Sequence, residues 1–261
     1  MPQQLLHQDM SPTWRHGSAG QLPVPYSLLR SQSIYLRCKP VVDCLFALVL
    51  LALTAPIILL AALIVRLTSR GPAFYSQTRL GRNSRPYTIY KIRTMAHDCE
   101  RVGGPRWATT HDPRVTRVGR LLRCTHIDEL PQLWNVLRGD MSLIGPRPER
   151  PEFITLLEQS VPHYKDRLQI RPGLTGLAQV QLPADTDLAS VRRKLAYDLY
   201  YLEHMGLWLD FRIFLSTALY LIGIAYHKVP KPLRVPNGEV VEWAYEARVI
   251  HIQDVVRVQP A

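Results

Sequence analysis

The sequence predicts a mostly helical α/β protein that associates with a membrane, and three observations lead to this fold class. An uncharged run extends from Cys44 to Val65, segments rich in aromatic and β-branched residues follow, and several helical stretches with turn residues between them fill the rest. We therefore expect a re-entrant membrane helix-hairpin near the N-terminus and a compact cytoplasmic domain with short strands. We also expect an interfacial amphipathic helix near the C-terminus.

The charge of the chain narrows the classes of partner. Its 261 residues carry a formal net charge of +11, and chains this basic bind polyanions such as anionic lipid headgroups or phosphorylated substrates. The basic residues continue beside the apolar run, and the sequence has neither a zinc-finger spacing nor an RNP-type aromatic motif. These features favour an anionic membrane surface and predict no nucleic-acid partner.

The N-terminal part divides into a tail and a membrane helix. Residues 1–38 are mostly polar and rich in Gln, Ser and Pro, so we expect a flexible tail there. Residues 39–67 form the predicted membrane helix, and Pro56 lies near its middle, where a missing backbone N–H kinks a helix. Basic residues flank both ends, and positive charge prefers the cytoplasmic side, so a hairpin that enters and leaves on one face satisfies both flanks. A straight span with a tolerated proline is the alternative.

Residues 68–226 contain the elements of the predicted compact domain, followed by a C-terminal extension over residues 227–261 that we expect to be poorly packed. Strands are expected at Phe74–Gln77 and Tyr87–Ile92, helices at Val115–Cys124, Pro151–Ser160 and Leu188–Leu202, a further helix opening at Asp128, and turns at Arg171–Gly173 and Thr175–Gly176. The apolar and aromatic stretch Leu207–Tyr226 has charges near its start and is too short to span, which indicates an interfacial helix.

Two adjacent carboxylates, Asp128 and Glu129, open the expected helix. Neighbouring helical residues point about 100° apart, so the two carboxylates are expected to have different roles. One can face a ligand while the other faces a metal or another part of the chain, and an ionised carboxylate is a competent nucleophile toward a neutralised phosphate. The alternative is an ordinary N-cap with an acidic first turn.

Several cations surround this pair in the sequence. Arg147 stands between Pro146 and Pro148, which hold its backbone extended, and its guanidinium could fork onto a phosphate. Arg123 lies just ahead of the carboxylates, and Lys91 alternates with Arg93 on an expected strand. For each of these cations, a solvated surface position is the alternative to phosphate binding.

Five motifs together resemble the bacterial sugar transferases, the small monotopic phosphoglycosyl transferases. They occur in the order of that family, over residues 39–226: Lys91–Met95, Asp128–Leu133, Gly145–Pro148, Arg171–Val180 and Tyr197–Tyr201. Many members of the family have Ser-Pro at the membrane kink, whereas this chain has Ala55-Pro56, which removes one hydroxyl partner for the freed carbonyls.

The resemblance implies an activity and a set of roles. The family transfers a sugar-1-phosphate from a nucleotide sugar to polyprenol phosphate and releases a nucleoside monophosphate. Its matching Asp is the nucleophile and the Asp-Glu pair works with Mg²⁺, so Asp128 and Glu129 are expected to be catalytic and metal-binding. Arg147, Arg123 and Lys91 are expected to bind substrate phosphate, and Pro56 to kink a re-entrant membrane helix.

We therefore expect a transferase of the bacterial inner membrane, with its catalytic domain on the cytoplasmic face, that begins exopolysaccharide, capsule or O-antigen synthesis. Its expected partners are a UDP-sugar, polyprenol (undecaprenyl) phosphate and downstream glycosyltransferases, and a homo-oligomer is compatible with this. The alternative is a non-catalytic basic membrane scaffold of a polysaccharide assembly complex.

Overall fold

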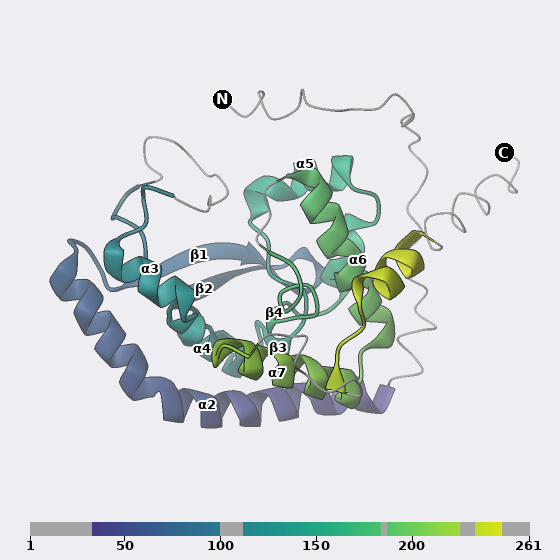
Figure 1. Cartoon of the computed structure of the whole chain (residues 1–261), viewed down its shortest axis with the longest axis horizontal. Coiled ribbons are helices and arrows are strands. Elements are labelled where there is room, and N and C mark those ends of the chain that lie inside the picture. Colours follow the sequence, from purple (N-terminus) through teal and green to yellow (C-terminus); the bar gives the residue numbers. More distant parts are fainter. Residues whose placement is uncertain (1–32, 100–111, 184–186, 225–232, 247–261) are drawn as a thin grey trace, which may run out of the picture.

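The structure is a computed structural model that describes residues 33–99, 112–183, 187–224 and 233–246. Figure 1 shows a long helix, α2, along one side of the molecule, with the hairpin of β1 and β2 and the shorter helices stacked above it. The elements are α2 (Ser33–Thr68), β1 (Phe74–Leu80), η2 (Arg82–Ser84), β2 (Pro86–Ile92), α3 (Arg117–Cys124), η3 (Ile127–Gln132), α4 (Leu133–Leu137), β3 (Ser142–Ile144), α5 (Pro151–Ser160), η4 (Tyr164–Gln169), β4 (Gly173–Thr175), α6 (Leu188–His204) and α7 (Leu207–Leu221).

Helix α2 is continuous over 36 residues and begins six residues before the predicted start of the membrane helix. Figure 1 shows it bent rather than straight. Pro56 lies inside it, and the hydroxyl of Thr54 donates to the carbonyl of Leu50 at 2.7 Å, a contact that also bends helices. The expected hairpin is thus one bent helix in the structure, and re-entrant insertion into a membrane stays a prediction.

The two sides of α2 differ in exposure. On the inner side Ala47, Ala61 and Val65 are 5% exposed or less, because they pack on the domain. On the outer side Leu53 and Leu59 are 70% and 67% exposed, and other large apolar residues follow the same side. Within the described residues, α2 is the one helix that is long and apolar enough to cross a membrane.

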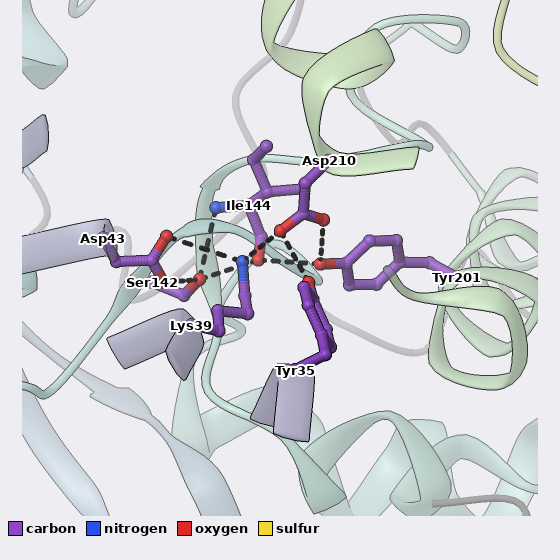
Figure 2. A network of polar contacts seen from close by, with 7 residues as sticks. All are labelled: Tyr35, Lys39, Asp43, Ser142, Ile144, Tyr201 and Asp210. Carbon is purple, nitrogen blue, oxygen red and sulfur yellow. Dashed lines mark hydrogen bonds and ion pairs between the residues drawn. The ribbon is translucent and has the colours of Figure 1, made fainter. Parts of the chain in front are cut away.

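A buried polar network anchors the N-terminal half of α2. The carboxylate of Asp210 in α7 accepts hydrogen bonds from Tyr35, Lys39 and Tyr201, each at 2.6 Å. Figure 2 shows how these side chains converge from α2, α6 and α7. Asp43 of α2 accepts from the Ser142 hydroxyl of β3 at 2.6 Å, so α2 is fixed to both α7 and β3.

The first sheet is the antiparallel pair β1–β2, in register from Phe74 opposite Ile92 to Leu80 opposite Pro86. Both predicted strands are confirmed, and β1 is longer than expected. The fully buried Asn135 of α4 ties the hairpin to the helices, because its side chain donates to the carbonyl of Thr88 and accepts from the amide of Tyr90. No pattern in the sequence indicates this link.

The second sheet, the parallel pair β3–β4, joins two of the sequence motifs. We expected only turns around Arg171–Gly173, but Gly173 begins strand β4. The glycines explain the difference, because a Cβ on Gly173 would lie 2.1 Å from the amide nitrogen of Gly145, and one on Gly176 would lie 2.2 Å from the carbonyl oxygen of Gly145. Only glycine permits this approach of the two backbones.

Most of the remaining elements lie close to their predicted bounds, but α7 ends at Leu221, short of the predicted Tyr226. Helix α5 has the predicted bounds, α6 extends the predicted helix by two residues, and Asp128 lies in the 3-10 helix η3 in place of an α-helix. The expectation of a poorly packed C-terminal extension is wrong for its described part, residues 233–246. There Val235, Val241 and Tyr245 are buried in the main core, since they fit against the rest of the domain.

Candidate active site

One cavity of about 810 Å³ brings the predicted site residues together. Its lining includes Asp128 and Glu129 from η3, Lys91 from β2, Arg123 from α3 and Arg147 from the loop after β3. These five residues come from four separate segments, three of them sequence motifs, and the fold places them around the same space. Their chemical roles remain predictions.

Asp128 is 6% exposed and contributes its side chain to the cavity wall. It follows His126, whose left-handed backbone conformation (φ 55°) starts η3. The Oδ1 atom of Asp128 is buried and accepts no hydrogen bond from the described residues. Burial and the neighbouring Glu129 raise the pKa of Asp128 to about 6, against the opposing charges of Lys91 and Arg123. Its carboxylate is therefore ionised at neutral pH but poorly stabilised.

Glu129 is held between two cations. Its Oε1 atom lies 2.6 Å from the Lys91 Nζ atom and 2.6 Å from an Nη atom of Arg147. Burial alone would raise the pKa of Glu129, but the charges of Arg147 and Lys91 outweigh it and hold that pKa well below its usual range. The two adjacent carboxylates thus have different environments, as their helical spacing predicted.

The residues of the motif Lys91–Met95 contact different parts of the protein. Lys91 reaches Glu129, whereas Arg93 turns to the segment after α2 and donates to the carbonyls of Ser69, Arg70, Gly71 and Pro72. Thr94 accepts from the Nε atom of Arg123 at 2.9 Å. Arg93 therefore fixes the segment that follows α2, and it also lines the cavity together with Lys91, so phosphate binding by Arg93 stays a prediction.

Several residues that hold the loop around Arg147 were not singled out from the sequence. Arg79 donates to the carbonyl of Pro148 at 3.2 Å, and Arg167 donates to the carbonyl of Arg147 at 2.7 Å. The amide of Gly173 donates to the carbonyl of Pro146 at 2.8 Å. Only Gly173 belongs to a motif that marked it, since isolated arginines on a basic chain give no signal in the sequence.

The cavity suits an anionic, phosphorylated ligand. The cations Arg79, Lys91, Arg93, Arg123, Arg147 and Arg150 line it, and guanidinium groups match phosphate oxygens in geometry. Among the described residues no three His, Cys, Asp or Glu side chains gather into a metal site by themselves. The donor-free Oδ1 atom of Asp128 fits a hard divalent cation whose other ligands come from phosphate oxygens and water.

Comparison with known proteins agrees with this chemistry. A family model described as "Bacterial sugar transferase" matches residues 34–223. A UDP-glucose:undecaprenyl-phosphate glucose-1-phosphate transferase of Caulobacter vibrioides is 49% identical over 69% of this chain and 67% of its own length. A UDP-N-acetylgalactosamine-undecaprenyl-phosphate N-acetylgalactosaminephosphotransferase of Aeromonas hydrophila is 42% identical over 73% of this chain.

The lengths of these relatives differ from the matched part. The match covers 45% of the Aeromonas protein, so this chain spans about half of that relative. In contrast, a protein named "Exopolysaccharide production protein PSS" of Rhizobium leguminosarum is 41% identical over 69% of this chain and 93% of its own length.

Proposed function

Because this chain belongs to the bacterial sugar transferase family, we propose that it transfers a sugar-1-phosphate from a UDP-sugar to undecaprenyl phosphate and releases UMP. The observation that carries the proposal is the carboxylate of Asp128, which lines a cavity surrounded by Lys91, Arg123 and Arg147. A carboxylate with a raised pKa among cations suits nucleophilic attack on a phosphate.

The transfer has two steps. In the first, the Asp128 carboxylate attacks the β-phosphorus of the UDP-sugar, an acyl phosphate bond forms, and the bond to the bridging oxygen breaks so that its electron pair leaves with UMP. In the second, an oxygen of the lipid phosphate attacks the same phosphorus and the carboxylate leaves. Two steps let a soluble and a lipid substrate use one site in turn.

The cations have a defined part in both steps. Arg147 and Lys91 form ion pairs with Glu129 before substrate binds. They would stabilise the charge that develops on the phosphoryl oxygens. Glu129 keeps both cations in place and stays ionised. When bound at Asp128 with substrate phosphate, Mg²⁺ would neutralise the diphosphate and favour the leaving of UMP.

The finer membrane arrangement is also proposed. Both halves of α2 pack on the same domain, since Lys39 bonds Asp210 near one end and Val65 packs with Leu122 of α3 near the other. A straight span would carry one of these ends across the bilayer and away from the domain. We propose that α2 enters and leaves on the cytoplasmic face, with its exposed apolar side in the lipid and α7 at the interface.

The sugar and pathway rest on the relatives alone. Relatives are named for UDP-glucose and for UDP-N-acetylgalactosamine, and one is named for exopolysaccharide production. We propose a UDP-hexose or UDP-N-acetylhexosamine as substrate in the first membrane step of a polysaccharide. Downstream glycosyltransferases and a further copy of the chain remain expected partners.

The test is UMP release by membranes that contain the protein, with a panel of UDP-sugars and undecaprenyl phosphate. A UDP-sugar labelled in the sugar should label the protein without lipid, and hydroxylamine should remove the label, as it does from an acyl phosphate. Asp128→Asn should take up no label. A non-catalytic scaffold predicts no UMP with any sugar, and a direct attack by the lipid predicts UMP without a labelled protein.

A further inference from the structure

The motif at Tyr197–Tyr201 in α6 has no part in the mechanism above, yet it contains a buried charge. Asp198 pairs with Arg167 of η4 at 2.7 Å, and the two side chains are 4% and 7% exposed. Neither lines the cavity. Burial of such a pair costs desolvation that its attraction seldom repays, so a buried ion pair is weak support for stability alone.

Arg167 connects this pair to the active site. The Nη2 atom that meets Asp198 also donates to the carbonyl of Arg147 at 2.7 Å, and Nη1 donates to the hydroxyl of Tyr164 at 2.8 Å. Asp198 and Tyr164 therefore fix the plane of the guanidinium, and the guanidinium fixes the orientation of one backbone carbonyl.

The position of that carbonyl gives the contact its importance. Pro146 and Pro148 on either side of Arg147 have no N–H, so they cannot be held through backbone donors. The carbonyl of Arg147 is one bond from the Cα atom that carries its side chain, and this side chain reaches Glu129 at 2.6 Å. A rotation of the peptide plane there would move the guanidinium in the cavity.

We infer that Arg167 and Asp198 are positioning residues, which hold the backbone of Arg147 so that its guanidinium faces the phosphate of the substrate. The inference rests on the proposed function for what Arg147 binds. The part of the inference that concerns how Arg147 is held rests on the contacts of Arg167 alone.

The test replaces both charges at once with Arg167→Met and Asp198→Leu. Apolar residues of similar size often replace a buried ion pair without loss of stability, so the melting temperature should stay near that of the parent. The kcat of UMP release should fall about 10-fold or more with KM within about 3-fold, because the lost contact acts mainly on the transition state.

A double-mutant cycle separates positioning from a general structural effect. In an Arg147→Ala background, the Arg167→Met/Asp198→Leu change should cost less than about 2-fold further, because the residue it positions is gone. Independent losses that multiply would overturn the inference. The control is Glu158→Gln/Lys165→Met, which removes the exposed ion pair beside Arg167 and should leave kcat unchanged.

A second measurement works without any activity. Amide hydrogen exchange of the segment 144–150 should be faster in the Arg167→Met/Asp198→Leu protein than in the parent and unchanged in the control. Unchanged exchange there would overturn the inference even if activity fell. If the parent releases no UMP with any sugar, the proposed function fails, and exchange alone then decides on positioning. If the double variant does not fold, the isosteric Asp198→Asn should give the same changes, only smaller.

Discussion

At the scale of residues, the surroundings raise the pKa of one carboxyl group and lower the pKa of its neighbour in the sequence. Glu129 has two cations within hydrogen-bond distance, whereas Asp128 has a buried oxygen with no donor among the described residues. Removing the negative charge of Asp128 should therefore stabilise the folded protein. Removing that of Glu129 should destabilise the arrangement of the two cations that it holds.

Asp128→Asn should raise stability at about pH 8 in the metal-free protein. The pKa of Asp128 is about 6 in the folded state against the ordinary value of 3.8 for an aspartate side chain, so the charged form disfavours folding, with its full effect above pH 6. The gain, on the order of 2 to 3 kcal/mol, should shrink as the pH falls from about 6 to about 4, where the parent carboxyl is protonated. Thermal unfolding in EDTA across this range measures it, and a gain that does not change with pH would contradict the assigned cause.

Glu129→Gln should act differently from Asp128→Asn. Lys91 and Arg147 lose the charge that they share, so their side chains should be less well fixed and kcat should fall about 100-fold. The labelled adduct on Asp128 should still accumulate slowly from a UDP-sugar without lipid. Absence of any adduct in Glu129→Gln, with a folded protein, would give Glu129 a direct part in the first step.

The residues of the site were predictable from the sequence to the extent that short motifs contained them. Asp128, Glu129 and Arg147 lie within compact motifs with restricted backbones. The role of Arg167 was not predictable from the sequence, because it depends on a contact with Arg147, which is 20 residues away in the chain, and on burial beside α6. The contacts of Arg93 with the segment after α2 were not predictable either, because alternation on a strand does not reveal which distant carbonyls a side chain meets.

At the scale of elements, α2 combines a proline with contacts at both ends. Pro56→Leu would restore a backbone donor to the middle of the helix and remove the ring clash. We expect it to straighten α2 and weaken the contacts of one end with the domain. A membrane-impermeant thiol reagent can follow this on proteins with a single cysteine, either Cys38 or an Arg70→Cys substitution.

In the parent, both cysteines should react from the cytoplasmic side of sealed vesicles. In Pro56→Leu, a fraction of molecules should label the two positions from opposite faces. Labelling of the parent from opposite faces would refute re-entrant insertion at once, whereas an unaltered pattern in Pro56→Leu would show that the contacts of α2 with the domain suffice to set the topology.

Two neighbouring tyrosines of α6 offer a matched comparison. Tyr201 is 1% exposed and donates to Asp210, whereas Tyr200 is stacked on His204 at 4.1 Å between ring centroids. Tyr201→Phe should lower the free energy of unfolding by about 1 to 2 kcal/mol, because the partly buried carboxylate of Asp210 loses a donor. Tyr200→Phe should change it by less than about 0.5 kcal/mol. Equal effects in thermal unfolding would contradict the network of Figure 2.

The longer elements were predictable and the shortest were not. Strands β1 and β2 and helices α5 and α6 are each seven residues or longer and carry their own local pattern, and α6 also begins at a capping box of Asp187 and Ser190. Strands β3 and β4 have three residues each, and their pairing depends on the contact between Gly145 and Gly173. A pairing that is decided by backbone contact between distant segments leaves no periodic pattern in either segment.

At the scale of the whole molecule, exposed apolar side chains and the short C-terminal helix lie on different sides. Most of the exposed large apolar residues lie on α2 and α7, including Trp208 and Phe211, and Trp134 of α4 is also half exposed, although Trp243 of the C-terminal helix is exposed too. Figure 1 places α4 and α7 beside α2, while the helix over residues 238–246 lies next to α6 and away from α2. The molecule therefore has one face suited to lipid.

Single-tryptophan proteins can test this orientation in vesicles that contain brominated phosphatidylcholine. The fluorescence of Trp208 and Trp134 should be quenched, because the bromine atoms lie in the hydrocarbon region that these residues face. Trp243 is 72% exposed and serves as the control, since its helix should remain in water. Strong quenching of Trp243 together with none of Trp208 would reverse the proposed orientation.

The segment over residues 233–246 has a practical consequence for anyone who trims this chain. The family match ends at residue 223, and a chain cut there would lose Val235, Val241 and Tyr245 from the core. Ala196 and Leu199 of α6 line the crevice next to Tyr245, and both would then be exposed to solvent on a side that does not face lipid. Exposed apolar surface there promotes aggregation. The shortest version that stays soluble in detergent must keep residues through 246, well beyond the border drawn by similarity to relatives.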